Sequence, residues 1–485
     1  MSWGTNAAPS SPKNGTNDPC APEAVVIRKL ALAAMAAAVP VCALAAPAEA
    51  AALRPGRVLA VTAKAGPAAG QVTFSWKQDG SHTTAFVIET GLTSFKANDP
   101  KLPDHGRNGR YFSVPAGRRS VTLSAAQVAS AGAPAGSANH LYYRLRAVNK
   151  TAAGTGIRDW PYLQSVGVRP VSPSAQGTAL RVASFNVRTA NATTDARTWL
   201  QRAPLVAQTI VSRNPGVVAL QELGPGRADG KKLSTTGSVR QTESLVNALR
   251  GNGGAKYRLV RTTPYGKPGV PEGTQGMRIL YDTSRYSLAS PCSDTSADGN
   301  YSSSCTFMLP VRSGDKATDR RRAAYAMLQD RATGKRFFVV SAHLDARHSS
   351  NLTTERSYEA LRGNQVKTVL ARMNAINTAH LPVVLAGDLN SWQNNKGGYA
   401  AHDALVGGGY YDTAAATTQV NVRYTTMNDF KRTIPNPGTS GWGARLDVIA
   451  VKGVTGAQRF ENVMKVTDSN RASDHNMIVA DFRLA

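Results

Sequence analysis

The sequence predicts two folded regions of different class: an all-β module over residues 54–170 and an α/β domain over residues 180–485. In the first region, short runs of β-branched and aromatic residues alternate with polar, glycine-containing turns, as in antiparallel sheets. In the second region, continuous apolar β-branched runs alternate with helix-like stretches, which is typical of sheets covered on both faces. Pro170, Pro173 and the nearby serines predict a linker over residues 171–179.

The clearest strands of the all-β module are Val72–Trp76, Ala85–Glu89 and Leu141–Asn149. In the last of these, every second residue is expected on the same face. A tryptophan on an early strand and a Tyr-x-Leu-x-Ala-x-Asn strand near the end resemble a fibronectin type III sandwich, and a generic immunoglobulin-like sandwich is the alternative. Residues 51–177 carry 15 basic and 5 acidic residues. The module therefore either adds affinity for a polyanion or serves as a spacer.

The α/β domain is predicted from several buried runs and two helix-like segments. The helix-like segments are Trp199–Ser212 and Arg362–Ile376. The strand-like runs are short, apolar and bounded by polar residues, as expected for covered sheets. They are Val217–Leu220, Phe337–Val340, Pro382–Ala386 and Leu446–Val451.

Polar residues of catalytic type stand at or just beyond the ends of most of these strands. Each one alone has an ordinary interpretation, such as a turn former, a strand-end cap or a buried histidine. Because α/β proteins place their sites at strand ends, the set together predicts an active site. Its members are Asn186, Glu222, His343, Asp388, Asn390, Asp447, Asp474 and His475.

The same residues stand in six short segments: S-F-N-V, L-Q-E, S-A-H-L, G-D-L-N, R-L-D-V-I and S-D-H. In this order, over residues 181–482, they resemble the signature segments of the endonuclease/exonuclease/phosphatase superfamily. Gly276–Asp282 is similar to the central strand of that family, and Arg362-x-x-Gln365 is similar to a helix start. The resemblance implies a deoxyribonuclease I-like four-layer α/β sandwich, with two sheets face to face, helices outside and a cleft at one edge.

Phosphodiester hydrolysis explains these residue types chemically. The reaction needs a cation to neutralise the phosphoryl oxygens, an in-line water activated by the metal, and help for the departing alkoxide. Oxygen ligands without thiolates favour Mg²⁺ or Mn²⁺, with Ca²⁺ as a further candidate. Asn186 and Glu222 are therefore the predicted metal ligands.

The resemblance also implies roles for the other site residues. His475 is expected to act as the general base, polarised by an acidic residue. Neighbours on a strand face opposite ways, so we expect Asp474 at the metal cleft and Asp447 as the residue that orients the histidine. Asp388 and Asn390 are expected to hold water and phosphate, and His343 to donate a hydrogen bond to the phosphoryl oxygen or the leaving group. These are the positions that match the family segments.

One position departs from the deoxyribonuclease-like pattern. That branch carries a glutamate on the central strand, whereas the corresponding segment here presents Arg278. A guanidinium can bind phosphate through two parallel hydrogen bonds, so Arg278 is a candidate for substrate binding. A surface arginine is the alternative.

Charge favours a polyanionic substrate. The chain has 57 basic and 31 acidic residues, a net charge of +26, and basic clusters such as Arg320–Arg322 could follow a phosphate backbone. A secreted nuclease acting on nucleic acid is the preferred function. The alternatives are a phospholipase C or sphingomyelinase acting at an anionic lipid surface, a sugar or inositol phosphatase, and a non-catalytic binding protein. The lipid alternative would use exposed loop aromatics, for which the candidates are Tyr399, Tyr410, Tyr411 and Trp442.

The N-terminal 50 residues predict secretion. An apolar run over Leu30–Ala46 follows a basic pair and precedes Ala48-Glu49-Ala50, the pattern of a signal peptide cleaved after Ala50. A membrane anchor is the alternative, but the run is shorter than the roughly 20 apolar residues that a spanning helix needs. No obligate protein partner is inferred.

Two cysteines would remain in the exported chain. Cys292 and Cys305 have twelve residues between them, and exported cysteine pairs usually form disulfides. Metal ligation and free thiols are the alternatives. Zinc normally takes four ligands, and the intervening segment supplies neither histidine nor cysteine.

Overall fold

The computed structural model describes most of the chain from Pro55 onward. The described residues are 55–92, 110–135, 139, 141–151, 154–157, 176–192, 197–224, 226–230, 238–260, 276–289, 305–316, 321–393, 395–437, 442–454 and 456–484. The predicted signal segment and Cys292 lie outside them, so the secretion signal and the Cys292–Cys305 disulfide stay predictions. Among the described residues, no helix combines the length and apolarity needed to cross a membrane.

Two antiparallel sheets form the all-β region. One has the order β1-β2-β5 and the other β4-β3-β6-β7. Their inner faces share one apolar core, in which Trp76 meets Phe86 edge-on with ring centroids 5.1 Å apart. The strands are β1 (Val58–Ala65), β2 (Val72–Gln78), β3 (Ala85–Gly91), β4 (Arg110–Pro115), β5 (Ser120–Leu123), β6 (Tyr142–Thr151) and β7 (Gly154–Ile157), with the short helix α1 (Ala125–Ser130) after β5.

Two larger mixed sheets organise the rest of the chain. The first has the order β10-β11-β9-β8-β21-β20-β18, and the second the order β12-β14-β15-β16-β19-β17 with β13 paired to β14. The first contains β8 (Thr178–Asn186), β9 (Val217–Gln221), β10 (Tyr257–Leu259), β11 (Arg278–Asp282), β18 (Thr418–Val420), β20 (Ala457–Val463) and β21 (Met477–Leu484). The second contains β12 (Tyr286–Leu288), β13 (Thr306–Met308), β14 (Arg322–Asp330), β15 (Arg336–His343), β16 (Val383–Asp388), β17 (Tyr411–Asp412) and β19 (Asp447–Lys452).

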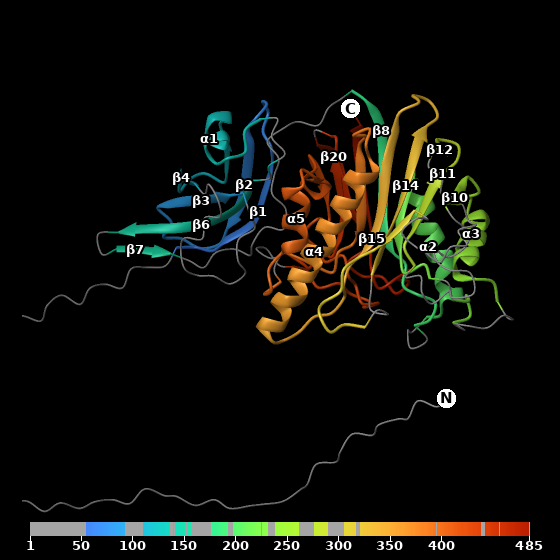
Figure 1. Ribbon diagram of the computed structural model, residues 1–485. Helices are drawn as coiled ribbons and strands as arrows, with labels where there is room; N and C mark the ends of the chain where they lie inside the picture. Colours follow the sequence, from blue (N-terminus) through green and yellow to red (C-terminus); the bar gives the residue numbers. More distant parts are fainter. Residues whose placement is uncertain are drawn as a thin grey trace, which may run out of the picture. The chain divides into compact units, whose positions relative to one another are not determined.

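The α/β region has four layers, as the family resemblance implied. Side chains on a strand alternate between faces, so Val182 of β8 joins the core between the sheets while Ala183 packs against helices. Figure 1 shows α4 and α5 on one side of the paired sheets and α2 and α3 on the other. The helices are α2 (Trp199–Arg213), α3 (Gln241–Gly251), α4 (Leu352–Ile376) and α5 (Ala400–Gly407), and the 3-10 turn η3 is Thr413–Ala415.

Strand pairing brings the predicted site residues to one edge of the sheets. β8 and β9 are parallel, with Asn186 opposite Gln221, the residue before Glu222. β15 and β16 are also parallel, and His343 is paired with Asp388. β16 and β19 are antiparallel, and their register places Asp388 opposite Asp447.

Candidate active site

Asn186 and Glu222 form one side of the site. The Asn186 amide donates from Nδ2 to Glu222 Oε1 and to Asp388 Oδ2, each at 3.0 Å. The second oxygen of Glu222 accepts from the backbone N–H of Thr189 at 3.1 Å. Burial raises the pKa of Glu222, but His343 and the hydrogen bond from the Asn186 amide outweigh burial and keep this pKa below its ordinary value. Glu222 is therefore a carboxylate at neutral pH.

The backbone at Glu222 is unusual, with a φ of 58° in the left-handed region. Leu223 donates its N–H to the carbonyl of Gly276 at 2.9 Å, which ties this turn to the start of β11. Gly276 also has a positive φ of 73°, and a Cβ there would lie 2.8 Å from the carbonyl carbon of Glu222. A glycine at this point is thus required for the close approach that positions the Glu222 carboxylate.

Two histidines flank Asp388. His343 Nε2 and His475 Nε2 each lie 3.6 Å from Asp388 Oδ2, and all three side chains are buried. Burial, together with the charge of Arg321, lowers the pKa of His343 to about 4. His343 is therefore a neutral imidazole at neutral pH, able to donate one hydrogen bond without carrying charge.

His475 is oriented by Asp447. The imidazole Nδ1 lies 2.9 Å from Asp447 Oδ2, which leaves Nε2 toward Asp388. Burial alone would lower the pKa of His475, but Asp447 and Asp388 raise it to about 10. A carboxylate at Nδ1 fixes the ring orientation and the tautomer of a histidine base, so the pair has the geometry of a proton-transfer dyad.

Asp474, the neighbour of His475, faces the other side of the site. Its Oδ2 lies 3.3 Å from a guanidinium nitrogen of Arg188, and its Oδ1 accepts from Ser473 Oγ at 3.1 Å. Burial raises the pKa of Asp474, and the negative charge of Glu222 adds to the rise. The negative charges of Asp474 and Glu222 repel each other, and a cation bound between the two carboxylates would offset this repulsion.

Asn390 closes the site beside β16. Its backbone N–H donates to Asp388 Oδ1 at 3.0 Å, and its Nδ2 donates to the carbonyl of Leu344 at 3.2 Å. The residue has a φ of 49°, so the chain turns sharply directly after β16. This turn holds the amide at the cleft, which it helps to line.

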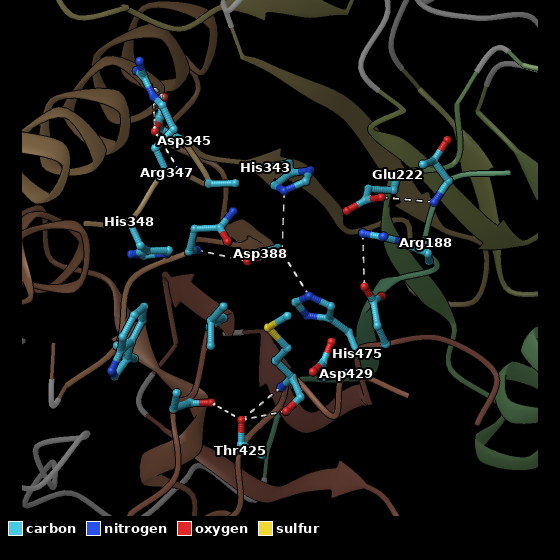
Figure 2. A pocket seen from close by; sticks show the side chains of 18 of the residues that line it. Arg188, Glu222, His343, Asp345, Arg347, His348, Asp388, Thr425, Asp429 and His475 are labelled. Atoms are coloured by element: carbon cyan, nitrogen blue, oxygen red, sulfur yellow. Dashed lines mark hydrogen bonds and ion pairs between the residues drawn. The ribbon is translucent and has the colours of Figure 1, made fainter. Parts of the chain in front are cut away.

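Most of these groups line a cleft of about 1120 Å³, whereas Asn186 and Asp447 lie buried behind its lining. Figure 2 shows Asp388 between the two histidines, with Glu222 and Arg188 on one side and Asp345, Arg347 and His348 on the other. Five carboxylates, three histidines and four cations are among the residues that line it. The cations are Arg188, Arg321, Arg347 and Lys431.

The donor set fits a hard divalent cation. Asp388, Asp447 and His475 each offer a ligand atom, and these atoms lie within 4.8 Å of one another. Asp447 Oδ1 is buried and has no hydrogen-bond partner among the described residues, so it has unused ligand capacity. Glu222 and Asp474 add two further carboxylates to the same cleft. Carboxylate and amide oxygens are ligands that Mg²⁺, Mn²⁺ and Ca²⁺ prefer.

Arg278 does not line the described cleft. It is 1% exposed on β11, where one terminal nitrogen donates to the carbonyl of its own neighbour Met277 at 2.8 Å. Substrate binding by Arg278 would require the side chain to leave this buried position. That role stays a prediction.

The aromatic residues proposed for a lipid surface are buried. Their exposed fractions range from 2% to 8%, so they cannot insert into an interface while the domain is folded. This part of the lipid hypothesis is wrong, because Tyr410, Tyr411 and Trp442 pack in the apolar cores and Tyr399 is buried as well. The residues are Tyr399, Tyr410, Tyr411 and Trp442.

Sequence reasoning missed several residues of the cleft. Arg188 stands two residues after Asn186, Arg347 and His348 follow His343 closely, and Trp392 stands two residues after Asn390. Their closeness to the predicted catalytic positions was the available signal. A charged or aromatic residue just past a catalytic strand end is well placed to line the same cleft.

The layered α/β fold, with its carboxylate and histidine cleft at the sheet edge, defines a phosphoester hydrolase. The model of the endonuclease/exonuclease/phosphatase family matches residues 183–475. The chain therefore belongs to this family, whose enzymes hydrolyse phosphoester bonds and typically use a divalent metal.

Solved structures similar to this chain are distant in sequence. An endonuclease/exonuclease/phosphatase from Bacteroides vulgatus is 22% identical with a TM-score of 0.46, covering 64% of this chain and 100% of its own. A mannosyl-6-phosphatase from Bacteroides thetaiotaomicron is 20% identical with a TM-score of 0.44, covering 62% and 98%. TDP2 from D. rerio, complexed with a single-strand DNA product, is 18% identical with a TM-score of 0.38, covering 62% and 98%. No curated protein matches the chain.

Proposed function

We propose that this chain is a secreted, metal-dependent phosphodiesterase that hydrolyses extracellular nucleic acid. The observation that carries the proposal is the His475–Asp447 pair, whose histidine lines one cleft with the Glu222 and Asp474 carboxylates and with Asp388 between the two histidines. The four cations of the cleft lining suit a phosphate backbone on either side of the reacting group.

The residues divide into two functional groups. His475 takes a proton from the attacking water through Nε2, while Asp447 holds its Nδ1–H. His343 donates a hydrogen bond to the phosphoryl oxygen or the leaving group, and Asn390 helps to hold the phosphate. Asp388, Asp447 and His475 could also hold a cation, but a metal on His475 would occupy the nitrogen that has to accept the proton. A divalent cation held instead by Asn186, Glu222 and Asp474 would leave His475 free, would neutralise the phosphoryl oxygens and, as a nearby positive charge, would lower the pKa of His475 toward neutrality.

A substrate panel tests the proposal. The purified protein is assayed against plasmid DNA, single-stranded DNA, RNA, sphingomyelin, mannose 6-phosphate and bis(p-nitrophenyl) phosphate, with and without excess chelator. We expect hydrolysis of nucleic acid that chelator abolishes and Mg²⁺ or Mn²⁺ restores. Full activity after exhaustive chelation would refute the metal mechanism. Turnover of sphingomyelin or mannose 6-phosphate with intact DNA and RNA would replace the nuclease assignment.

Two variants separate the metal from the base. Glu222→Gln should need a higher metal concentration for half-maximal activity, because it weakens a ligand. His475→Ala should lose at least about a hundredfold in kcat at every metal concentration, the usual scale for loss of a general base. Circular dichroism counts the folded molecules in each sample. A His475→Ala enzyme with near-normal turnover per folded molecule would contradict the assignment.

The exported state and the accessory module are part of the same proposal. We infer that cleavage after Ala50 releases a chain with a Cys292–Cys305 disulfide and a fibronectin type III-like module. The orders β1-β2-β5 and β4-β3-β6-β7 and the shared core support an immunoglobulin-like arrangement of this module. N-terminal sequencing and mass spectrometry of the exported protein test these points. An intact residue 1–50 segment, or two free thiols, would contradict them.

A further inference from the structure

Two aromatic rings lie together in the cleft, away from the groups that move protons. The rings of Trp392 and His348 have centroids 4.8 Å apart and are inclined by 57°. They come from different loops, since His348 follows β15 and Trp392 follows β16. Figure 2 shows His348 across Asp388 from Glu222 and Arg188. Hydrolysis as derived above uses neither ring.

A buried polar network fixes the position of these rings. His348 Nδ1 lies 3.0 Å from Glu355 Oε1, and the N–H of Ser349 donates to Glu355 Oε2 at 2.6 Å. Glu355, almost fully buried near the start of α4, also accepts from Arg362 at 3.0 Å and from Asn395 Nδ2 at 2.7 Å. Asn395 belongs to the loop that carries Trp392. One carboxylate thus ties both ring-bearing loops to the same helix.

Arg362 strengthens this attachment. Its side chain is fully buried, and it donates to the carbonyl of Arg347 at 2.8 Å and to Glu359 Oε2 at 2.8 Å. Satisfied buried charge networks hold their members in one arrangement, because breaking one partner leaves an uncompensated charge. The two rings therefore form a pre-organised surface.

The rings are close enough to the reacting phosphate to contact the adjacent part of the substrate. Trp392 is two residues from Asn390, and an extended chain rises about 3.3 Å per residue, so their backbones are at most about 7 Å apart. Both rings line the same cleft as Asp388 and His343. A phosphoester bound at Asp388 would therefore lie in the same cleft as the Trp392 ring.

The aromatic pair, a nearby cation and the phosphoryl site together indicate which kind of substrate ring binds here. Aromatic side chains stack on unpaired nucleobases regardless of sequence. Arg321 lines the same cleft near His343, and among the residues that the structure describes it forms no ion pair with a carboxylate. It is therefore available for a second phosphate. An aromatic surface, a cation and a phosphoryl site in one cleft match a base, its phosphate and the scissile phosphate of a polynucleotide.

We propose that Trp392 and His348 bind the nucleobase next to the scissile phosphate, and that the enzyme consequently prefers single-stranded nucleic acid. This inference rests on the proposed nuclease function and adds a substrate class to it. Stacking requires a base that is free of its partner strand, because a paired base in a duplex presents only its edges.

The test uses single-stranded oligonucleotides with one phosphodiester and phosphorothioates elsewhere, so that the cleaved bond is known. The base on either side of that bond is present or removed as an abasic site. For the wild-type enzyme, removal of one of the two bases should lower kcat/KM by about tenfold. Trp392→Ala should lose the same factor on the intact oligonucleotide and nothing further on the abasic one. Trp392→Phe should retain most of the wild-type value.

Controls separate this inference from the nuclease proposal. Tyr111→Ala removes an exposed aromatic outside the cleft and should behave as wild type on every substrate. The base site is refuted, while the nuclease function stands, if the Trp392→Ala enzyme loses a further factor in kcat/KM on the abasic oligonucleotide. The same conclusion follows if Trp392→Ala cleaves intact single strands at the wild-type rate. If wild-type enzyme cleaves no oligonucleotide and hydrolyses a sugar phosphate instead, the nuclease proposal fails first. Equal rates on duplex and single strand would also overturn the preference.

Discussion

Asp388 Oδ2 is where side chains from three other segments meet: the Asn186 amide at 3.0 Å, and the Nε2 atoms of His343 and His475 at 3.6 Å each. One carboxylate therefore aligns a metal-side amide, a hydrogen-bond donor and a proton acceptor. Asp447 acts one step further out, because it touches only the Nδ1 side of His475. Substitution of a residue that acts only through a neighbouring catalytic group should therefore lower kcat while changing KM little.

Asp447→Asn tests that distinction. The amide keeps the size of the side chain but removes the charge that orients and polarises His475. We expect kcat to fall by at least about a hundredfold with KM changed little. Asp481→Asn is the matched control, because Asp481 forms a partly exposed ion pair with Arg181 on β21 and β8, outside the cleft. Steady-state kinetics on bis(p-nitrophenyl) phosphate gives both constants. An Asp447→Asn enzyme with normal kcat would show that His475 needs no carboxylate partner.

At the scale of elements, the turn after β9 and the start of β11 together present Glu222. Gly276→Ala tests this arrangement, since its Cβ would lie 2.8 Å from the backbone of Glu222. We expect a several-fold rise in the metal concentration needed for half-maximal activity. Gly253→Ala is a matched control, with a φ of 80° and nothing within 4 Å of the added Cβ. Both variants carry strain from the positive φ, of about 1 kcal/mol, but only Gly276→Ala should change metal dependence. Identical metal titrations would contradict the role of Gly276.

The sequence predicted the strands of the sheets well, but it predicted the start of one long helix less well. The buried runs over Val217–Leu220 and Phe337–Val340 lie within β9 and β15 as expected. The helix expected from Arg362 begins ten residues earlier, at Leu352. Its first turns bury Glu355 and Glu359 in place of apolar residues, so the usual amphipathic pattern is absent. Burial of these acids depends on Arg362 and on the loops after β15 and β16, which no local pattern reveals.

Part of the candidate site could likewise be predicted from the sequence, and part of it could not. Strand-end reasoning found Asn186, Glu222, His343 and Asp388 because parallel strands bring their ends to one edge. Asp474 and His475 do contact different partners, Arg188 and Asp447, but they lie in the loop before β21, so the strand alternation used to predict this does not apply to them. The cleft wall formed by Trp392 depends on how two loops pack against α4. Such packing is set by tertiary contacts, so local sequence could only place these residues near the site.

At the scale of the whole molecule, charge is distributed unevenly around the chemistry. The chain has a net charge of +26, yet the cleft lining holds five carboxylates and four cations. The cleft is thus less positive than the chain as a whole, whose net charge favours a polyanionic substrate. A small anion gains little from such a field, whereas a polynucleotide releases a counterion for each phosphate that the protein neutralises.

Salt dependence should therefore report the number of phosphates contacted. With metal saturating, log(kcat/KM) for a single-stranded oligonucleotide should fall linearly with log salt, by about 0.7 for each contacted phosphate. Hydrolysis of bis(p-nitrophenyl) phosphate should depend on salt much less. Arg321→Gln should reduce the oligonucleotide slope by about 0.7, because this cation lines the cleft beside His343. Arg336→Gln removes an exposed cation at the start of β15, the strand that ends at His343 in the cleft, and should leave the slope unchanged. Equal slopes for the oligonucleotide and the small ester would mean that the basic surface does not contact the substrate, and a slope unaffected by Arg321→Gln would remove this residue from the phosphate path.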